Sequence, residues 1–272
     1  MTATADAAAN FLGVPTNPAE ELKQELTEAI VGWERSRPRS LQTAIGPSEV
    51  GTECVRKLAY KLAGFQQFNF LPDPWPTIQG TALHSVFEEA FGGQPDRWLV
   101  ETEVHVTRTL KGKCDLYDVQ RARVIDHKTA GATGMQRYRG HGPKMQQIVQ
   151  LGLYALGMEN TGRPVREVAL AFYPLGGQMR GLYTWVAPYD TPLAEAGSPV
   201  EGVDAGVTVR QLALDALTRF DNIRALVAEL DIEHDPTRIS LVPASPSKLC
   251  EWCDHWRRGS QSLTQGCPGQ AS

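Results

Sequence analysis

Residues 111–130, KGKCDLYDVQRARVIDHKTA, hold two short apolar runs on either side of a polar turn, a pattern that predicts a β-hairpin. Each arm carries an aspartate, Asp115 or Asp126, where a strand packed on a core ordinarily has an apolar residue. A four-residue turn at 119–122 would place Asp115 directly opposite Asp126. Opposed residues share one face of a sheet, and so does Lys128, two positions further along. The hairpin therefore brings two acids and a lysine together on a half-buried surface.

Two facing carboxylates repel each other and destabilise a sheet unless a cation lies between them. Carboxylate oxygens are hard ligands of the kind that Mg²⁺ and Mn²⁺ prefer. A lysine beside such a site can orient a nucleophilic water or stabilise developing phosphate charge. The alternative, for these residues alone, is an exposed hairpin edge whose charges are solvated.

The remaining pattern predicts an α/β or α+β protein. Helical spacing predicts helices near 17–37, 48–64, 77–91, 144–159 and 207–230. Besides the hairpin, strand patterns occur at 98–106, 165–173 and 180–187. Clean alternation over 98–106 puts Glu101 and Glu103 on one face, close in sequence to the hairpin.

The chain has 272 residues, 42% of them hydrophobic, enough for one large domain with or without appendages. It has no apolar run near the ~20 residues that a membrane span needs. The N-terminal sequence also lacks the features of a secretory signal. We therefore expect a cytoplasmic protein with no membrane contact, whose residues 1–16 form a mobile tail.

Positive charge is concentrated in one part of this acidic chain, whose formal net charge is −4. The sequence from His127 to Met158 contains no carboxylate, but it includes Lys128, Arg137, Arg139 and Lys144. Such a window suits a confined site for a polyanion. The alternative is a chance gap among the surface acids. We take Arg137, Arg139 and Lys144 as candidate DNA contacts.

Further polar residues stand on otherwise apolar helices. These are His84 in GTALHSVFEEAF, and Gln150 and Tyr154, which are four apart in QQIVQLGLYALGM. Read in order, the chain shows a helical His84, G-K-C-D ending at Asp115, D-H-K from Asp126 to Lys128, and Q-L-G-L-Y. This series resembles the motifs of the PD-(D/E)XK nucleases, most closely the RecB-like branch, over about residues 48–160.

The resemblance implies a restriction-endonuclease-like core, a central mixed sheet flanked by helices, that cleaves DNA with Mg²⁺ or Mn²⁺. It implies that His84, Asp115 and Asp126 are metal ligands and that Lys128 is the catalytic lysine. Gln150 and Tyr154 would contact DNA or support the site. The family's strand glutamate maps to Glu103, with Glu101 as the alternative.

Four of the five cysteines follow a second pattern: Cys54, the pair Cys250-x-x-Cys253, and Cys267. This layout resembles the iron–sulfur nucleases of the same superfamily, which include the CRISPR-associated RecB-like exonucleases and the AddB nuclease domain. The resemblance implies a [4Fe–4S] cluster that joins a cysteine-rich segment, 236–272, to a nuclease domain at 17–235 with a helical N-terminal part.

The spacing also departs from that pattern, because the gap between Cys253 and Cys267 is longer than the family's usual one. Four thiolates would equally suit a structural zinc ion, with His255 as a substitute ligand. Cys114 alternates to the face opposite Asp115, and we interpret it as a core residue.

The expected function is that of a stand-alone iron–sulfur DNA exonuclease in recombination, repair or phage replication, acting on single-stranded DNA or duplex ends. The same residues fit a CRISPR-adaptation nuclease. A rival of another class is a non-catalytic nucleic-acid-binding protein with a zinc-held tail. The sequence has no G-x-x-x-x-G-K-[ST] motif, so any helicase would be a separate partner, as would a recombinase or single-strand-binding protein.

Overall fold

The computed structural model describes residues 17–37, 44–69, 74–195, 200, 202–204 and 206–269. The chain divides into two compact units, one of Met1–Gln42 with Pro72–Ile78 and one of Thr43–Leu71 with Gln79–Ser272. The predicted N-terminal tail, 1–16, lies outside the described residues. Among the described residues, no helix combines the length and apolar character that crossing a bilayer requires.

In the first unit, helix α2 spans Pro18–Ser36 and begins as its sequence predicts. Asn17 caps it by accepting a 3.0 Å hydrogen bond from the Ala19 amide, and Pro18 occupies the first helical turn. One stripe of this helix is apolar and exposed: Leu22, Leu26, Ile30 and Trp33.

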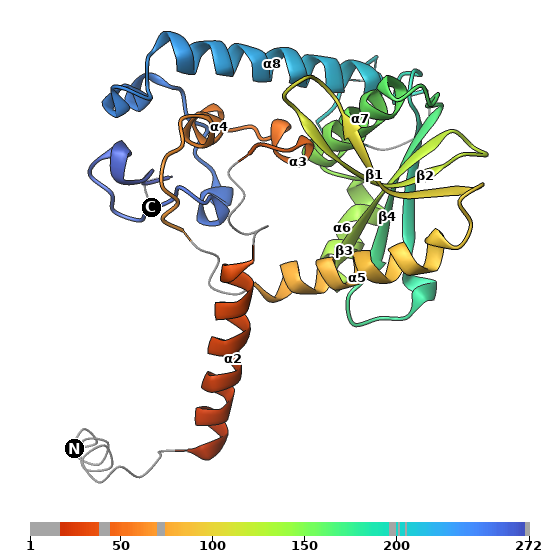
Figure 1. Cartoon of the computed structure of the whole chain (residues 1–272), viewed down its shortest axis with the longest axis horizontal. Coiled ribbons are helices and arrows are strands. Elements are labelled where there is room, and N and C mark those ends of the chain that lie inside the picture. The colour runs from red at the N-terminus through yellow and green to blue at the C-terminus, as the bar shows by residue number, and fades with distance from the viewer. Residues whose placement is uncertain are drawn as a thin grey trace. The chain divides into compact units, whose positions relative to one another are not determined.

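The second unit is built on a five-stranded mixed sheet in the order β1-β2-β3-β4-β5 (Figure 1). β3 and β4 are parallel and the other neighbours are antiparallel. A parallel pair requires a crossover connection, which α6 and α7 supply here. The strands are β1 Trp98–His105, β2 Lys111–Asp118, β3 Arg123–Ala130, β4 Glu167–Pro174 and β5 Tyr183–Pro188. This sheet confirms the predicted α/β class and its mixed sheet flanked by helices.

The two faces of the sheet are covered by different helices. Helix α7, Met145–Asn160, packs across β1 to β4, and ten of its residues are buried. Helix α5, Trp75–Gly92, covers the other face, where the Phe87 ring lies 4.5 Å from His127 and 4.4 Å from Tyr173, measured between ring centroids. Alternation along β3 therefore turns His127 towards α5, and Asp126 and Lys128 towards α7.

Helix α8, Val209–Glu229, packs along α7, which leaves almost no room between them at Gly152. A Cβ atom at Gly152 would lie 2.8 Å from the Ala213 Cβ and 2.9 Å from the Val209 carbonyl oxygen. Gly157 similarly faces Val104 of β1, at 2.7 Å from its Cβ. Both glycines set how closely α7 approaches its neighbours.

Two local predictions differ from the structure. The single helix expected over 48–64 is two helices, α3 Pro47–Val50 and α4 Val55–Leu62. The break follows Gly51, where a Cβ would lie 3.0 Å from the Gln146 Cα, so the bend lets α3 pack against α7. Helix α6, Ala132–His141, was not predicted, because its two internal glycines and mixed polarity hide the helical period.

The C-terminal segment lies against α4 through contacts of the protein itself. Its 3₁₀ turns are η2 Pro236–Leu241, η3 Lys248–Trp252 and η4 Leu263–Gln265; a further turn, η1 Met179–Gly181, precedes β5. The Arg56 guanidinium donates to the Val242 carbonyl at 2.7 and 2.9 Å, and the Tyr60 hydroxyl donates to that of Leu263 at 2.7 Å. Beyond Val242, the buried residues of the described segment are His255 and Gly266.

We expect Gly152→Ala to destabilise the protein by about 2 kcal/mol, because overpacking against the α8 backbone outweighs the gain in helix propensity. Gly80→Ala is the matched control, since this glycine of α5 has no atom within 4 Å of a built Cβ. It should leave stability unchanged or raise it by up to about 1 kcal/mol. Chemical denaturation measures both, and equal effects of the two variants would contradict this view of the α7–α8 contact.

Candidate active site and thiol cavity

The hairpin forms as predicted and then opens into a fork at Asp115. The loop 119–122 joins β2 to β3, and the strands pair only from Asp118 with Arg123 to Leu116 with Ile125. Asp115 is the next residue, opposite Asp126 in register. Its Oδ2 accepts a 2.8 Å hydrogen bond from the His127 backbone amide. A carboxylate thus replaces the backbone partner that this amide would otherwise have in the β2–β3 ladder.

His84 of α5 and Glu101 of β1 meet Asp115 at this fork. The His84 Nδ1 lies 3.2 Å from Glu101 Oε1, and its Nε2 lies 3.9 Å from Asp115 Oδ2. One ligand atom from each of the three residues falls within 4.8 Å of the others, and in the described part of the chain only this group does so. The structure thereby brings together two of the three predicted ligands, His84 and Asp115, with a glutamate.

The glutamate of this group is Glu101, and Glu103, the first choice made from the sequence, lies outside it. Glu103 is exposed, and its Oε1 lies 3.2 Å from the His105 Nε2. Glu101 has a φ of +45°, a left-handed conformation that is uncommon for a non-glycine residue and costs about 1–2 kcal/mol. The β1–β2 pairing skips this residue and resumes at Thr102 in the same register. This local departure gives Glu101 surroundings that strand alternation does not predict.

Asp126 and Lys128 form a buried pair beside this group. Asp126 is 1% exposed, and its Oδ2 lies 2.8 Å from the Lys128 Nζ. Within the described residues, neither carboxylate oxygen of Asp126 accepts a hydrogen bond of good geometry. A buried carboxylate with unused acceptor capacity is costly unless a cation or water is supplied.

The electrostatics of the two aspartates also favour a cation. Burial, and next the neighbouring charge of Asp126, raise the pKa of Asp115 to about 7. The contact with Glu101 raises the pKa of His84 despite partial burial. Burial lowers the pKa of Lys128, but Asp126 more than offsets it, so the net pKa is raised. A divalent ion among these oxygens would relieve the repulsion between the acids, so the residues present fit Mg²⁺ or Mn²⁺.

Helix α7 supports the lysine from one side. The Lys128 Nζ donates to Gln150 Oε1 at 3.1 Å, and the Gln150 Nε2 donates to the Tyr154 hydroxyl at 3.3 Å. Gln150 and Tyr154 are both buried, and burial raises the pKa of Tyr154. In this structure the pair is placed to position Lys128.

His127, between the two charged residues of the D-x-K motif, belongs to the packing of the other face. Its ring lies among Phe87, Phe91 and Tyr173, and burial lowers its pKa to about 4. Cys114 is fully buried, as expected of a core residue, and burial raises the pKa of its thiol.

The three candidate DNA-binding residues do not lie together. Arg137 and Lys144 line one cavity of about 520 Å³. Arg139 instead donates a 2.6 Å hydrogen bond to the Gly181 carbonyl and lines a separate hollow near the β4–β5 connection. These three basic residues of the carboxylate-free window therefore line two separate hollows, not one binding surface.

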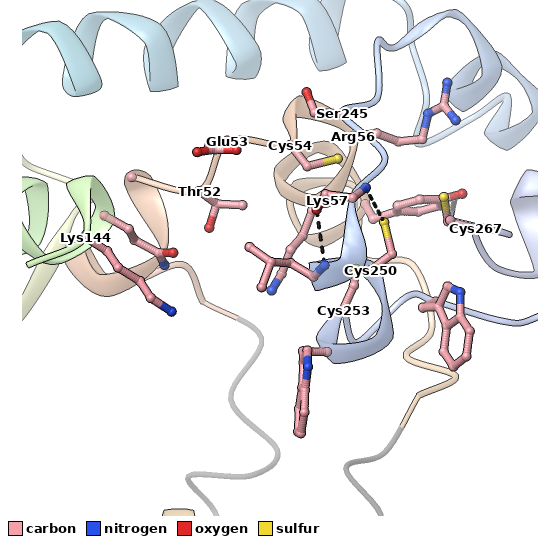
Figure 2. Close-up of a pocket in the computed structure, with 18 of the residues that line it drawn as sticks. Thr52, Glu53, Cys54, Arg56, Lys57, Lys144, Ser245, Cys250, Cys253 and Cys267 are labelled. Carbon is pink, nitrogen blue, oxygen red and sulfur yellow. Dashed lines mark hydrogen bonds between the residues drawn. The ribbon is translucent and has the colours of Figure 1, made fainter. Parts of the chain in front are cut away.

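The same cavity, here called the thiol cavity, is lined by all four of the predicted cluster cysteines (Figure 2). Cys54 is the N-cap of α4, and the others come from the C-terminal segment. Burial comes first among the causes that raise the pKa of Tyr60, followed by the Cys267 thiol and, more weakly, those of Cys253 and Cys54. Tyr60 of α4 lines the same cavity, although it is nearly two hundred residues from the C-terminal cysteines.

The thiols do not lie as close together as the ligands of a single ion would. No three of the five cysteines, all of them described, bring their sulfurs within 4.8 Å of one another, whereas zinc at ~2.3 Å from each sulfur requires about 3.8 Å. The alternative zinc ligand, His255, is buried; its Nδ1 lies 3.1 Å from the Gln66 carbonyl oxygen and its ring stacks on Tyr60.

The model of the PD-(D/E)XK nuclease superfamily matches residues 48–258. This range includes the fork, the lysine and its support on α7, and three of the four cysteines of the thiol cavity. The chain belongs to the PD-(D/E)XK nuclease superfamily.

Solved structures similar to this chain include two exonucleases. An alkaline exonuclease (LHK-Exo) from Laribacter hongkongensis shares 14% identity, with a TM-score of 0.48, over 74% of this chain and 95% of its own. A phage-related exonuclease from Haemophilus somnus 129PT shares 13% identity, with a TM-score of 0.39, over 65% and 82%. A search of curated proteins found no significant match.

We expect Mn²⁺ to raise the thermal stability of the protein, because it relieves the repulsion at the fork. At a hundredfold excess over its Kd, binding adds ~2.7 kcal/mol, which corresponds to a rise in Tm of about 5–10 °C. Asp115→Asn and Glu101→Gln should reduce this rise, whereas Glu103→Gln should retain it. Thermal unfolding with and without Mn²⁺ measures the effect, and an equal loss in Glu101→Gln and Glu103→Gln would refute the assignment of Glu101.

Proposed function

We propose that this nuclease is a divalent-metal-dependent DNA exonuclease that acts at the fork of β2 and β3. The observation that carries the proposal is the convergence of Asp115, Glu101 and His84 beside the Asp126–Lys128 pair. These residues come from four separate elements and form a compact group of acids with one ammonium. A binding protein without catalysis has no need of two buried acids that repel each other.

In this proposal Asp115, Glu101 and His84 hold Mg²⁺ or Mn²⁺, with Asp126 at its side. The ion would lower the pKa of a bound water and neutralise charge on the scissile phosphate. The Lys128 ammonium, held by Asp126 and Gln150, is directed to the same region. It is suited to orient the attacking water and to stabilise the added negative charge of the transition state. Tyr154 fixes Gln150, and the packing of His127 fixes the strand that carries both reactive residues.

We further propose that the thiol cavity holds a [4Fe–4S] cluster. Four thiols in one cavity are the donors that such a cluster takes, and their separation, too wide for one ion, leaves room for several. The cluster would stabilise the C-terminal segment, because so few residues beyond Val242 are buried. The cluster would supplement the hydrogen bonds from Arg56 and Tyr60 and fasten the residues that follow.

The pathway in which the enzyme acts is also part of the proposal. Recombination, repair and phage replication all require removal of nucleotides from DNA ends. A separate helicase, recombinase or single-strand-binding protein would supply or receive the strand. CRISPR adaptation is the alternative setting for the same chemistry. The reaction takes place where DNA is found, which is the cytoplasm if the source is a prokaryotic cell.

We expect Asp126→Ala and Lys128→Ala each to lower Mg²⁺- or Mn²⁺-dependent degradation of linear DNA by at least about 10²-fold, the scale for loss of one electrostatic group. Glu101→Ala should act in the same direction, and Glu103→Ala should change the rate by less than about twofold, since it stands outside the group. Release of nucleotides from labelled linear DNA measures the rate. Near-normal degradation by Asp126→Ala would remove the fork from the mechanism.

We expect Cys54→Ala to lose bound iron and to expose residues 244–269 to proteolysis. Bringing together cysteines this far apart costs about 5 kcal/mol of chain entropy, which metal–thiolate binding offsets. Residues 236–242 should remain protected, because Ile239 and Val242 are buried.

Cys114→Ala is the control for Cys54→Ala and should keep the iron. Iron and sulfide content, together with broad visible absorption, distinguish a cluster from colourless zinc. A full metal complement in Cys54→Ala would mean that the C-terminal cysteines form a separate site.

A further inference from the structure

The thiol cavity has features that holding four thiols does not require. The cysteines gather around α4 and the C-terminal segment, and Lys144, at the start of α7, lies on the opposite side (Figure 2). The volume of the thiol cavity, about 520 Å³, is in the range that accommodates a whole small-molecule ligand. Space therefore remains between the thiols and α7.

Two large apolar side chains of η3 border this space and face solvent. Trp252 and Leu249 are each 64% exposed, although both line the cavity. The other tryptophan of the lining, Trp256, donates its indole N–H to the Pro268 carbonyl at 3.1 Å. A tryptophan that is mostly exposed beside a hollow offers a flat aromatic face to a ligand. Nucleic-acid bases stack on such faces whatever their sequence.

The charge of the lining is positive, although the protein is acidic overall. The charged side chains are Arg56, Lys57, Arg137 and Lys144 against one acid, Glu53. Arg56 is engaged with the Val242 carbonyl. In the described part of the chain no carboxylate lies within ion-pair distance of Lys57 or Lys144. Two ammonium groups in the lining of the same cavity as an exposed indole match the phosphates and the base of one strand.

Helix α7 places this cavity at a short distance from the fork. Lys144 is its N-cap and Gln150, which holds Lys128, is six residues further along. At 1.5 Å per residue these positions are about 9 Å apart along the helix. A strand rises ~3.4 Å per nucleotide along the axis of a duplex, and an unpaired, extended strand covers more per nucleotide, so a few nucleotides span this distance. One strand can therefore occupy both places together.

We infer that a single strand of DNA binds across the thiol cavity, with a base stacked on Trp252 and phosphates at Lys57 and Lys144. The inference rests on the proposed nuclease function and names a substrate contact beyond the fork. The interior of a duplex does not fit the same contact, because its bases are stacked on one another and present no free face to a side chain. The strand at the cavity is thus unpaired.

Binding of a fluorescein-labelled oligothymidylate, measured by anisotropy without added divalent metal in an Asp126→Asn background, tests this contact. Trp252→Leu should weaken binding at least about fivefold, the factor that corresponds to ~1 kcal/mol of lost stacking. Trp252→Phe should restore binding to within about twofold of the parent, since it keeps an aromatic face. Trp33→Leu removes another exposed tryptophan, on α2, and should have no effect.

The two lysines are tested by the salt dependence of the same binding. Lys57→Gln with Lys144→Gln should reduce the slope of log K against log salt by about 1.4, at ~0.7 per phosphate on a single strand. The paired control, Lys111→Gln with Lys113→Gln on β2, should leave the slope unchanged. Lys57 also acts on a thiol, since burial raises the pKa of Cys253 and the lysine charge partly offsets this. Iron content is therefore measured in each variant.

Several outcomes would overturn the inference. Undiminished binding by Trp252→Leu, failure of Trp252→Phe to restore it while the iron content is normal, or an unchanged salt slope would each do so. The inference would also fail if Trp252→Leu weakened binding to a blunt duplex as much as it weakened binding to the oligothymidylate. Normal DNA degradation by Trp252→Leu in the otherwise unmodified chain, together with unchanged binding, would leave the nuclease assignment standing. Absence of all DNA binding by the parent would instead overturn both.

Discussion

The contact between the Asp115 carboxylate and the His127 amide is the one on which the site depends. It ends the β2–β3 ladder at a defined residue, so the strands separate there without leaving a buried amide unpaired. The separation gives His84 access from the α5 side, while Asp126 and Lys128 remain on the α7 side. Without this fork, a continuous sheet would keep the two faces apart.

The structure accepts local energetic costs at the fork. Asp126 is almost fully buried and Glu101 has a left-handed backbone conformation. Neither feature stabilises the protein by itself, and each is of the kind found where a ligand supplies what the chain lacks. The surroundings compensate with close packing, as the aromatic side chains around His127 and the tight contacts of α7 show.

Much of the site could be predicted from the sequence because it depends on short-range pattern. The register of the hairpin follows from its turn, and the facing of Asp115 and Asp126 follows from the register. Gln150 and Tyr154 are one helical turn apart and could be placed on one face. The class of the fold followed in the same way from the order of its elements.

The rest could not be predicted, because tertiary contacts decide it. Alternation treats Glu101 and Glu103 alike, and only the backbone conformation at Glu101 separates them. The break after Gly51 depends on the approach of α7, which is distant in sequence. Arg137 and Arg139 are likewise neighbours in sequence, but they lie on different sides of α6 and serve different hollows.

The burial of α7 along most of its length also limits how the chain can change in length. One residue inserted between Lys144 and Gln150 would rotate everything that follows by about 100°, and Gln150 would turn away from Lys128. A whole turn would restore the face, but it would shift the helix by ~5.4 Å against the close contact at Gly152. Insertions and deletions are therefore excluded from this helix. Surface loops that neither contact this helix nor set the register of the strands can accommodate them.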